Sequence, residues 1–289
     1  MNLLTFDIEE WVLYKGAQTV LIKECDQYLE QILDKLDERQ IKATFFCVGA
    51  MAEAFPHVVR LIQGRGHEIG CHSATHTWLN KMTEQECRED THRAVSNLEQ
   101  CIGKKVLSYR APAFSIGRNN VWAFDILAEN GITCDASVFP AARDFGGFPN
   151  FGVQKPCIIR HNGICLKEFP VPMTTVFGKR LAYSGGGYFR FFPLWYVKKE
   201  IAQSDYVMCY FHLGDLLPES HGVMTKKAYE DYFKEPGTIK ARYVRYVKSN
   251  LGKKNSLGKL KTLLDSTDFM NIEQSVGQID WDKAPIVEL

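Results

Sequence analysis

The chain has 289 residues, 45% of them hydrophobic, and its 35 Lys and Arg almost balance 34 Asp and Glu to give a net charge of +1. This length suits one large α/β domain, and the balanced charge excludes the strongly basic domain typical of nucleic-acid-binding proteins. The N-terminus lacks the basic and apolar regions of a signal peptide, and no apolar run is long enough for a transmembrane segment. Nine cysteines without a CxxC pair indicate free thiols in a reducing compartment, so we expect a cytoplasmic protein, with the inner face of the membrane as an alternative location.

Short apolar strands alternate with helices over roughly the first half of the chain. Apolar runs predict strands at 3–6, 43–48, 68–71, 106–109 and 132–134. Amphipathic patterns between them predict helices near 29–36, 57–63, 84–102 and 119–130. The third of these helices begins at a capping box, Thr83 to Glu86, and ends at Gly103. This alternation predicts parallel βα units.

The second half of the chain is less regular. Residues 145–182 predict hairpins and loops, Ser184 to Gly187 a glycine loop, and residues 206–211 another buried strand. From about residue 221 the chain is more basic, especially around 248–261, and it predicts helices near 238–251 and 259–265. We interpret residues 1–220 as an α/β barrel and residues 221–289 as a helical extension packed on it.

Five polar residues of interest each follow the C-terminal end of a predicted strand: Asp7, His72, Arg110, Asp135 and His212. In an α/β barrel these strand ends converge on one face, where the active site lies. The coincidence therefore predicts one site built from segments that are far apart in the sequence.

Two histidines, His72 and His76, are four residues apart directly after a predicted strand. If this segment is a helical turn, both rings lie on one face and can share a metal ion, an interpretation that the preceding strand favours over two unrelated histidines. Catalytic metal sites commonly combine two His with one carboxylate. The acidic run from Asp7 to Glu10 is the best source of that carboxylate and of a second one to act as a general base.

Three further residues have two interpretations each. Arg110 pairs with the base carboxylate or forms a structural salt bridge, and Asp135 orients a histidine or caps a turn. His212 acts as the general acid for the leaving amine or is a structural core histidine.

Together these segments resemble the five motifs of the NodB-homology polysaccharide deacetylases, carbohydrate esterase family 4. The first four motifs, TFDD, H(S/T)xxH, RxP and DxS, resemble Thr5-Phe6-Asp7, His72-Ser73-Ala74-Thr75-His76, Arg110-Ala111-Pro112 and Asp135-Ala136-Ser137. Tyr210-Phe211-His212 resembles the fifth, which bears a histidine. Their order agrees from Leu3 to about Leu216, and the tail is similar to extensions of a bacterial subgroup linked to surface-glycan assembly.

The resemblance implies a distorted, TIM-like (β/α) barrel, expected to be seven-stranded, with one divalent metal ion. It implies an enzyme that removes N-acetyl groups from an N-acetylated sugar of a polysaccharide or of its lipid-linked precursor. By this likeness Asp7 is the general base, oriented by Arg110, and His212 is the general acid, supported by Asp135. His72 and His76 are metal ligands, and a backbone N–H near Ala113 helps the metal to stabilise the oxyanion.

The sequence departs from the family at Ile8, where the usual second Asp is a metal ligand. Glu9 is our choice for that ligand because alternate residues of a strand share a face, but Glu10 stays open. Zinc is the first choice of metal, and cobalt, nickel, manganese and iron also suit the ligands. Arg190, Tyr188 and Ala113 are expected to contact substrate, and Glu168 is a weaker candidate, with packing at the barrel rim as the alternative.

Two other functions stay open at this point. One is hydrolysis of a small amide by the same fold, as in allantoinase-like relatives, which requires a closed pocket instead of an open cleft. The other is a carbohydrate-binding remnant without catalysis, which requires that no metal binds. The sequence does not indicate the oligomeric state.

Overall fold

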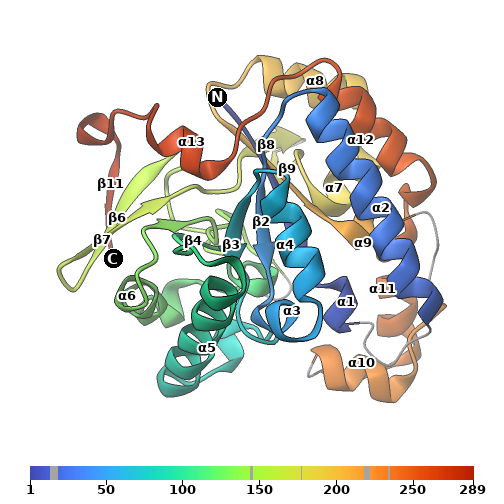
Figure 1. Ribbon diagram of the computed structural model, residues 1–289, viewed down its shortest axis with the longest axis horizontal. Coiled ribbons are helices and arrows are strands. Elements are labelled where there is room, and N and C mark those ends of the chain that lie inside the picture. The colour runs from blue at the N-terminus through green and yellow to red at the C-terminus, as the bar shows by residue number, and fades with distance from the viewer. Residues whose placement is uncertain (14–18, 144–145, 177, 218–221, 234) are drawn as a thin grey trace.

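Figure 1 shows a computed structural model of the protein, which describes residues 1–13, 19–143, 146–176, 178–217, 222–233 and 235–289. Its main sheet has the strand order β10-β1-β2-β3-β4-β5-β7-β6-β11 within these residues. The strands of this sheet are β1 (Asn2–Ile8), β2 (Thr44–Cys47), β3 (Glu68–Cys71), β4 (Ser108–Tyr109), β5 (Cys134–Asp135), β6 (Cys157–His161), β7 (Ile164–Glu168), β10 (Val207–His212) and β11 (Ile286–Glu288).

Every neighbouring pair from β10 across to β7 is parallel, which makes a run of seven strands among the described residues. The predicted α/β class and parallel sheet are therefore confirmed. Strand β6 pairs antiparallel with β7, and β11 pairs parallel with β6 at the end of the sheet. The hydrogen-bonded order ends at β10 and β11, so the ladder stays open, although Gly185 forms a parallel bridge with Tyr210 beside β10.

Helices cover the sheet, and Figure 1 shows α2, α4 and α5 along one side of β1 to β3. Strand β1 is buried from Leu3 to Ile8, as expected for a parallel strand covered on both faces. The helices that follow the early strands are α1 (Glu10–Leu13), α2 (Thr19–Glu38), α3 (Gly49–Ala54), α4 (Pro56–Gly64), α5 (Glu84–Ile102) and α6 (Trp122–Glu129). The capping box predicted for α5 is present at Thr83 and Glu86, and Gly103 ends the helix with a φ of 68°.

Residues 145–182 contain hairpins, as predicted: within the described positions they are β6–β7 and the pair of β8 (Met173–Val176) and β9 (Lys179–Ala182). The predicted glycine loop, Ser184 to Gly187, differs, because its second half forms the start of α7 (Gly186–Phe191). A Cβ on Gly185 would lie 2.2 Å from the Tyr210 carbonyl oxygen, so this glycine lets the chain approach β10. Helix α8 (Leu194–Ala202) follows.

The C-terminal segment packs into the same core as the early strands. Leu260, Leu263 and Ile272 are fully buried, and Met270 bridges to Leu3 of β1. Its helices are α10 (Lys226–Phe233), α11 (Ile239–Asn250), α12 (Ser256–Leu264) and α13 (Ile272–Val276). The division of the chain at residue 220 stays a prediction.

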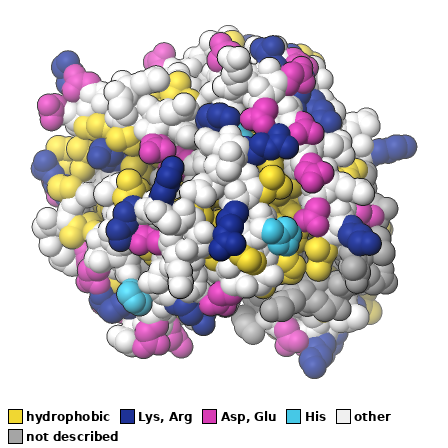
Figure 2. Space-filling model, in the orientation of Figure 1, with side chains coloured by type: hydrophobic (Ala, Val, Ile, Leu, Met, Phe, Trp, Pro, Cys, Tyr) yellow, Lys and Arg dark blue, Asp and Glu magenta, His cyan; other side chains and the backbone are white. Residues whose placement is uncertain are grey.

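The described residues also show the surface charge, the character of the helices and the state of the cysteines. Lys and Arg are interspersed with Asp and Glu on the face in Figure 2, as the near-neutral charge suggests. None of the helices in the described ranges has both the length and the apolar composition to cross a bilayer. All nine cysteines are described and unpaired, and only Cys165 is exposed.

A buried carboxyl pair lies within the sheet, where Asp135 of β5 is the register partner of Glu168 of β7. Both side chains are fully buried, which contradicts the expectation that Glu168 contacts substrate. Burial and the adjacent Asp135 raise the pKa of Glu168 well above its usual value. Ser137 Oγ donates to Asp135 at 2.6 Å, and the Val138 N–H donates to Glu168 at 3.1 Å. Burial in the sheet therefore favours the protonated form of Glu168.

This protonated state predicts how stability depends on pH. Because the folded-state pKa of Glu168 exceeds its unfolded value of about 4.3, the wild type loses up to about 1.4 kcal/mol of stability per pH unit above that value, until the folded pKa is reached. Glu168→Gln removes this loss, so the free energy of unfolding of the variant minus that of the wild type should rise between pH 5 and pH 8 in urea titrations. Glu38→Gln, at a side chain 65% exposed, is the control and should show no such trend. A constant difference for Glu168→Gln would contradict the assignment.

The contact between α3 and α5 gives a second prediction. A Cβ on Gly49 would lie 2.7 Å from the Cα of Ala94, so Gly49→Ala must separate the two helices and should lower the free energy of unfolding by about 1–3 kcal/mol. Gly258 of α12 has open space around its Cα, so Gly258→Ala should instead raise it by about 0.5–1 kcal/mol. Thermal and urea unfolding measure both, and equal effects from the two substitutions would refute this packing.

Candidate metal centre

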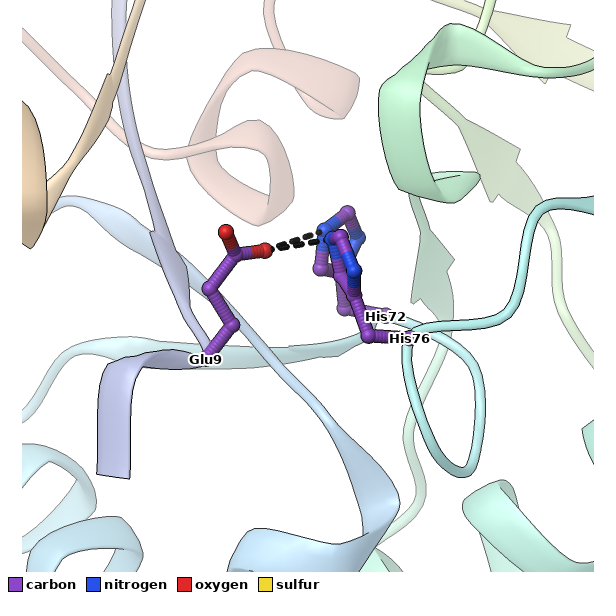
Figure 3. Close-up of side chains that lie close together, drawn as sticks. All are labelled: Glu9, His72 and His76. Atoms are coloured by element: carbon purple, nitrogen blue, oxygen red, sulfur yellow. Dashed lines mark ion pairs between the residues drawn. The ribbon is translucent and has the colours of Figure 1, made fainter. Parts of the chain in front are cut away.

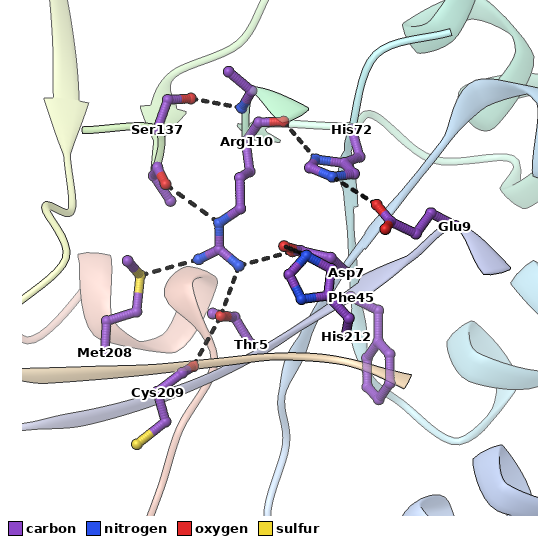
Figure 4. Close-up of polar contacts among 12 residues, drawn as sticks. Thr5, Asp7, Glu9, Phe45, His72, Arg110, Ser137, Met208, Cys209 and His212 are labelled. Atoms are coloured by element: carbon purple, nitrogen blue, oxygen red, sulfur yellow. Dashed lines mark hydrogen bonds and ion pairs between the residues drawn. The ribbon is translucent and has the colours of Figure 1, made fainter. Parts of the chain in front are cut away.

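The strand-end residues meet at one edge of the sheet, as predicted. Asp7 at the end of β1 is the register partner of His212 at the end of β10. Arg110 follows β4 and reaches across the strands to Asp7, and His72 follows β3 (Figure 4). Asp135 is the exception, because its carboxyl group faces Glu168 and Ser137.

Glu9, His72 and His76 form a compact buried cluster (Figure 3). Glu9 Oε2 lies 2.6 Å from His76 Nε2 and 3.4 Å from His72 Nε2. One potential ligand atom from each residue lies within 4.8 Å of the other two. Two imidazole nitrogens and one carboxylate oxygen at this spacing make a typical donor set for a divalent ion.

A loop, and not the expected helical turn, brings the two histidines together. Ser73 and His76 both have a left-handed φ of 62°. The His76 N–H donates to Ser73 Oγ at 2.9 Å, and the Ala74 N–H donates to Asp90 of α5 at 2.8 Å. These bonds hold the strained backbone, so the helical prediction for this segment was wrong although its two rings converge.

The polar atoms of the cluster fit a metal ion. His72 Nδ1 lies 2.7 Å from the Arg110 carbonyl, an acceptor, so the ring proton belongs on Nδ1 and the Nε2 lone pair faces Glu9. His72 Nε2 and Glu9 Oε2 are buried without a hydrogen-bond partner in the described structure. Burial opposes ionisation of Glu9, but the charges of His76 and His212 hold its pKa well below its usual value. A cation between these atoms would satisfy both lone pairs, and the bond from Nδ1 to a carbonyl orients the ring for it.

Glu10, the alternative ligand, is not part of this cluster. Its carboxylate accepts the Gly214 N–H at 2.5 Å and the Glu9 N–H at 3.3 Å. Burial and the adjacent Glu9 charge raise the pKa of Glu10 to about 7. Of the two candidates, Glu9 is the one whose carboxylate lies beside both imidazoles.

Arg110 is fully buried and connects several strands. Its Nη1 donates to Asp7 Oδ1 at 2.8 Å and to Thr5 Oγ1 at 2.9 Å, and its Nε donates to the Ala136 carbonyl at 3.2 Å. The guanidinium also lies 4.3 Å from the ring centroid of Phe46. Arg110 therefore forms a buried ion pair with Asp7 that ties strands together, and the role of Asp7 as the base stays a prediction.

His212 has a different partner from the predicted one. Its Nδ1 lies 2.9 Å from Asp215 Oδ2, one turn further along in α9 (Leu213–Leu216), and its Nε2 lies 3.6 Å from Asp7 Oδ2. The support predicted from Asp135 was therefore wrong, because Asp135 bonds within the β5–β7 pair. Burial alone would lower the pKa of His212, but Glu9, Asp215 and Asp7 raise it to about 10. The sequence does contain a signal for this pair, an Asp three residues after the His, which the prediction did not use.

The three residues predicted to contact substrate, Arg190, Tyr188 and Ala113, have different surroundings in the structure. The side chain of Arg190 is nearly buried and donates to the Ser249 carbonyl. Its guanidinium lies 3.3 Å from the Asp215 carboxylate and forms an ion pair with it. Tyr188 is half-buried and packs against the hydrophobic core. Ala113, with a left-handed φ of 55°, packs beside Trp78 at the rim.

Tyr232 of α10 is a site residue that the sequence did not indicate. Its ring stacks on His76 at a centroid distance of 6.3 Å and an angle of 19°, and its edge meets Trp78. The ring is 37% exposed, so one part of it stays available beside the cluster. No local pattern connects residue 232 with a histidine so far away in the sequence.

Comparisons with known proteins agree with this geometry. The polysaccharide deacetylase family model matches residues 2–134, and a domain of unknown function, DUF3473, matches residues 136–277. A peptidoglycan-N-acetylglucosamine deacetylase from Bacillus cereus is 31% identical over 38% of this chain and 44% of its own length. The chain thus spans less than half of that relative.

Solved structures share the fold along the whole chain. One structure, from Mycobacterium smegmatis, bears the name of a polysaccharide deacetylase and is 18% identical to this chain. Its TM-score is 0.62, and the match covers 100% of this chain and 92% of that structure. A carbohydrate esterase family 4 pseudoenzyme from Bacillus anthracis is 14% identical with a TM-score of 0.50, covering 100% and 69%. At these identities the likeness concerns the fold alone.

The deacetylase match contains Asp7, Glu9, His72, His76 and Arg110, whereas His212, Asp215 and Tyr232 lie in the DUF3473 match. Both regions therefore contribute to one site. Residues 2–134 of the chain thus form a polysaccharide deacetylase domain of the NodB-homology, carbohydrate esterase family 4 type, which is joined to a DUF3473 region.

Proposed function

We propose that the protein removes N-acetyl groups from an N-acetylated sugar, with one divalent metal ion held by Glu9, His72 and His76. The observation that carries this proposal is the pair of buried atoms without a hydrogen-bond partner, His72 Nε2 and Glu9 Oε2, beside Asp7 and His212. Family membership supports deacetylation, and the Bacillus cereus relative supports an N-acetylglucosamine unit as the substrate.

Zinc is the metal that we propose first, with cobalt, nickel, manganese or iron as substitutes. Three protein ligands leave at least one position open on such an ion. When bound, the ion would supply Lewis acidity to the amide carbonyl and to the attacking water. The Nδ1 bond from His72 to the Arg110 carbonyl keeps that ring in the required tautomer.

Asp7 is the proposed general base. Arg110 holds its Oδ1, while Oδ2 faces His212 and is available to accept a proton from water. The side chain is almost fully buried, so its orientation is fixed before substrate arrives. Water then adds to the amide carbon as its proton passes to Asp7.

His212 is the proposed general acid. Asp215 occupies its Nδ1, which leaves the Nε2 proton to transfer to the amine nitrogen as the carbon–nitrogen bond breaks. Its side chain is 34% exposed, so a substrate nitrogen can approach it. The products are acetate and the free amine of the sugar.

The substrate side of the site is the exposed part of Tyr232, beside His76. An aromatic face next to the reacting centre suits the apolar face of a sugar ring. The backbone near Ala113 is the proposed oxyanion donor. The free thiols support a reducing compartment, where a lipid-linked precursor is more accessible than a finished wall polymer.

One alternative has a specific observation in its favour. The pseudoenzyme from Bacillus anthracis shares the fold, so the fold by itself is compatible with a carbohydrate-binding remnant. The arrangement of Asp7, Arg110, His212 and Asp215 supports catalysis instead, because a binding remnant has no need of an oriented base and acid.

Metal loading tests the ligand set. His72→Ala, His76→Ala and Glu9→Gln should each weaken zinc binding by more than about 100-fold, because each removes a ligand. Glu10→Gln, the neighbouring control, should bind one equivalent, and Asp7→Asn should keep the metal but lose turnover. Elemental analysis after chelation and repletion gives the stoichiometry. Loss of metal in Glu10→Gln but not in Glu9→Gln would reassign the acidic ligand.

Asp215 gives a test of the general acid. Asp215→Asn should lower kcat on an acetylated chitooligosaccharide by about 100-fold with little change in KM, because the ring of His212 loses its orienting acceptor. Asp125 contacts His161 Nδ1 at 2.9 Å in the same manner far from the site, so Asp125→Asn is the matched control and should keep full activity. An unchanged kcat in Asp215→Asn would exclude this positioning role.

A further inference from the structure

Helix α11 turns its apolar side to solvent. Ile239 is 79% exposed, Tyr243 58% and Val247 43%, and Leu251, just after the helix, is 54% exposed. These residues are four positions apart and therefore form one stripe along the helix. No residue of the helix is buried.

The opposite side of α11 carries the arginines that attach it to the protein. Arg242 donates from Nε to the Gly237 carbonyl and from Nη1 to the Met224 carbonyl. Arg245 lies 4.7 Å from the ring centroid of Phe233. A surface helix ordinarily packs its apolar stripe on the core, so this inverted arrangement is not explained by folding.

Two aromatic residues extend the stripe beyond the helix. Phe191 is 65% exposed and Trp195 is 68% exposed. Arg190, next to Phe191, donates to the Ser249 carbonyl at the end of α11, and the backbone of Gly252 packs directly on that of Arg190. Arg190 thus connects the segment that bears the two exposed aromatic residues to the end of α11, and we call the stripe and these two residues together the α11 face.

The charge around the α11 face has one sign. Residues 239–255 contain six basic residues and no acidic residue: Lys240, Arg242, Arg245, Lys248, Lys253 and Lys254. The chain as a whole has a net charge of only +1, so this is a local concentration. Figure 1 shows α11 at the edge of the molecule, near α9 and α10.

We propose that the α11 face docks on the surface of an anionic lipid bilayer, with α11 lying in the plane of the headgroups. An apolar stripe with Lys residues beside it, and with Trp and Tyr in the same surface, matches a helix that binds at the membrane interface. A second copy of the chain is disfavoured as the occupant, because two such faces would bring like charges together.

Docking would place α11 between the lipid surface and the metal cluster. Contacts lead from Arg245, on the protein side of α11, to Phe233, from Phe233 to Tyr232 at 4.8 Å, and from Tyr232 to His76. The lipid part of a lipid-linked glycan would then stay in the bilayer while its sugar extends past α11 toward the cluster. The docking itself does not depend on catalysis, so it can be measured without turnover.

Flotation of the full chain with phosphatidylcholine vesicles containing 30% phosphatidylglycerol, in roughly 0.1 M salt, tests this proposal. The wild type should float with these vesicles and be released by high salt. The double substitution Ile239→Ser and Val247→Ser should weaken binding by at least about tenfold, as should Lys240→Glu with Lys254→Glu. Leu107→Ser, at a residue 44% exposed elsewhere, is the control and should bind as the wild type does.

The proposal fails if the wild type does not float, or if the α11 variants bind as well as the Leu107 control. It also fails if light scattering shows a dimer that the Ile239 and Val247 substitutions dissociate, since the face would then join two copies. Circular dichroism of each variant verifies that the fold is kept. Retention of zinc by every variant separates failure here from failure of the metal assignment.

Discussion

The buried guanidinium of Arg110 is the constraint on which the site depends. It is fully inaccessible to solvent, and it bonds to Thr5 and Asp7 of one strand and lies beside Met208 of another. Removing one partner of such a buried ion pair typically lowers the free energy of unfolding by about 3–5 kcal/mol. The order of the strands and the positions of these charges therefore depend on each other. The carbonyl of the same residue fixes the ring of His72. One residue thus orients the proposed base and one proposed metal ligand together (Figure 4).

The two family regions divide the chemistry between them. The deacetylase region holds the proposed metal ligands and the base, and the DUF3473 region holds His212, its partner Asp215, and Arg190 behind that partner. The acid side is therefore built within a short stretch of chain, from the end of β10 into α9. This compactness explains how Asp135 is free to form a structural pair with Glu168 in the sheet.

The sequence predicted the strands and their ends because those signals are local. Apolar runs mark strands that are buried on both faces, and a polar residue directly after such a run, as at Asp7 or His212, marks the edge where strands meet. The choice of Glu9 agrees with the geometry, although the residue lies just beyond β1.

The remaining features depend on contacts that no local pattern encodes. The left-handed backbone at Ser73 and His76 is held by a hydrogen bond that the Ala74 N–H donates to Asp90 of α5, so helical spacing gave the wrong conformation and still the right neighbours. Arg190 was expected at the substrate because it follows a glycine-rich segment, but packing against the end of α11 turns it inward. Tyr232 comes from a helix whose position is set only by tertiary packing.

The central claim is that Glu9, His72 and His76 share one ion, and diffraction at the zinc absorption edge from crystals of the zinc-loaded chain tests it most directly. We expect one anomalous peak at about 2.0–2.2 Å from Nε2 of both histidines and from a carboxylate oxygen of Glu9. A peak coordinated by Asp7 or Glu10 in place of Glu9, or the absence of any peak between the two imidazoles, would contradict the account.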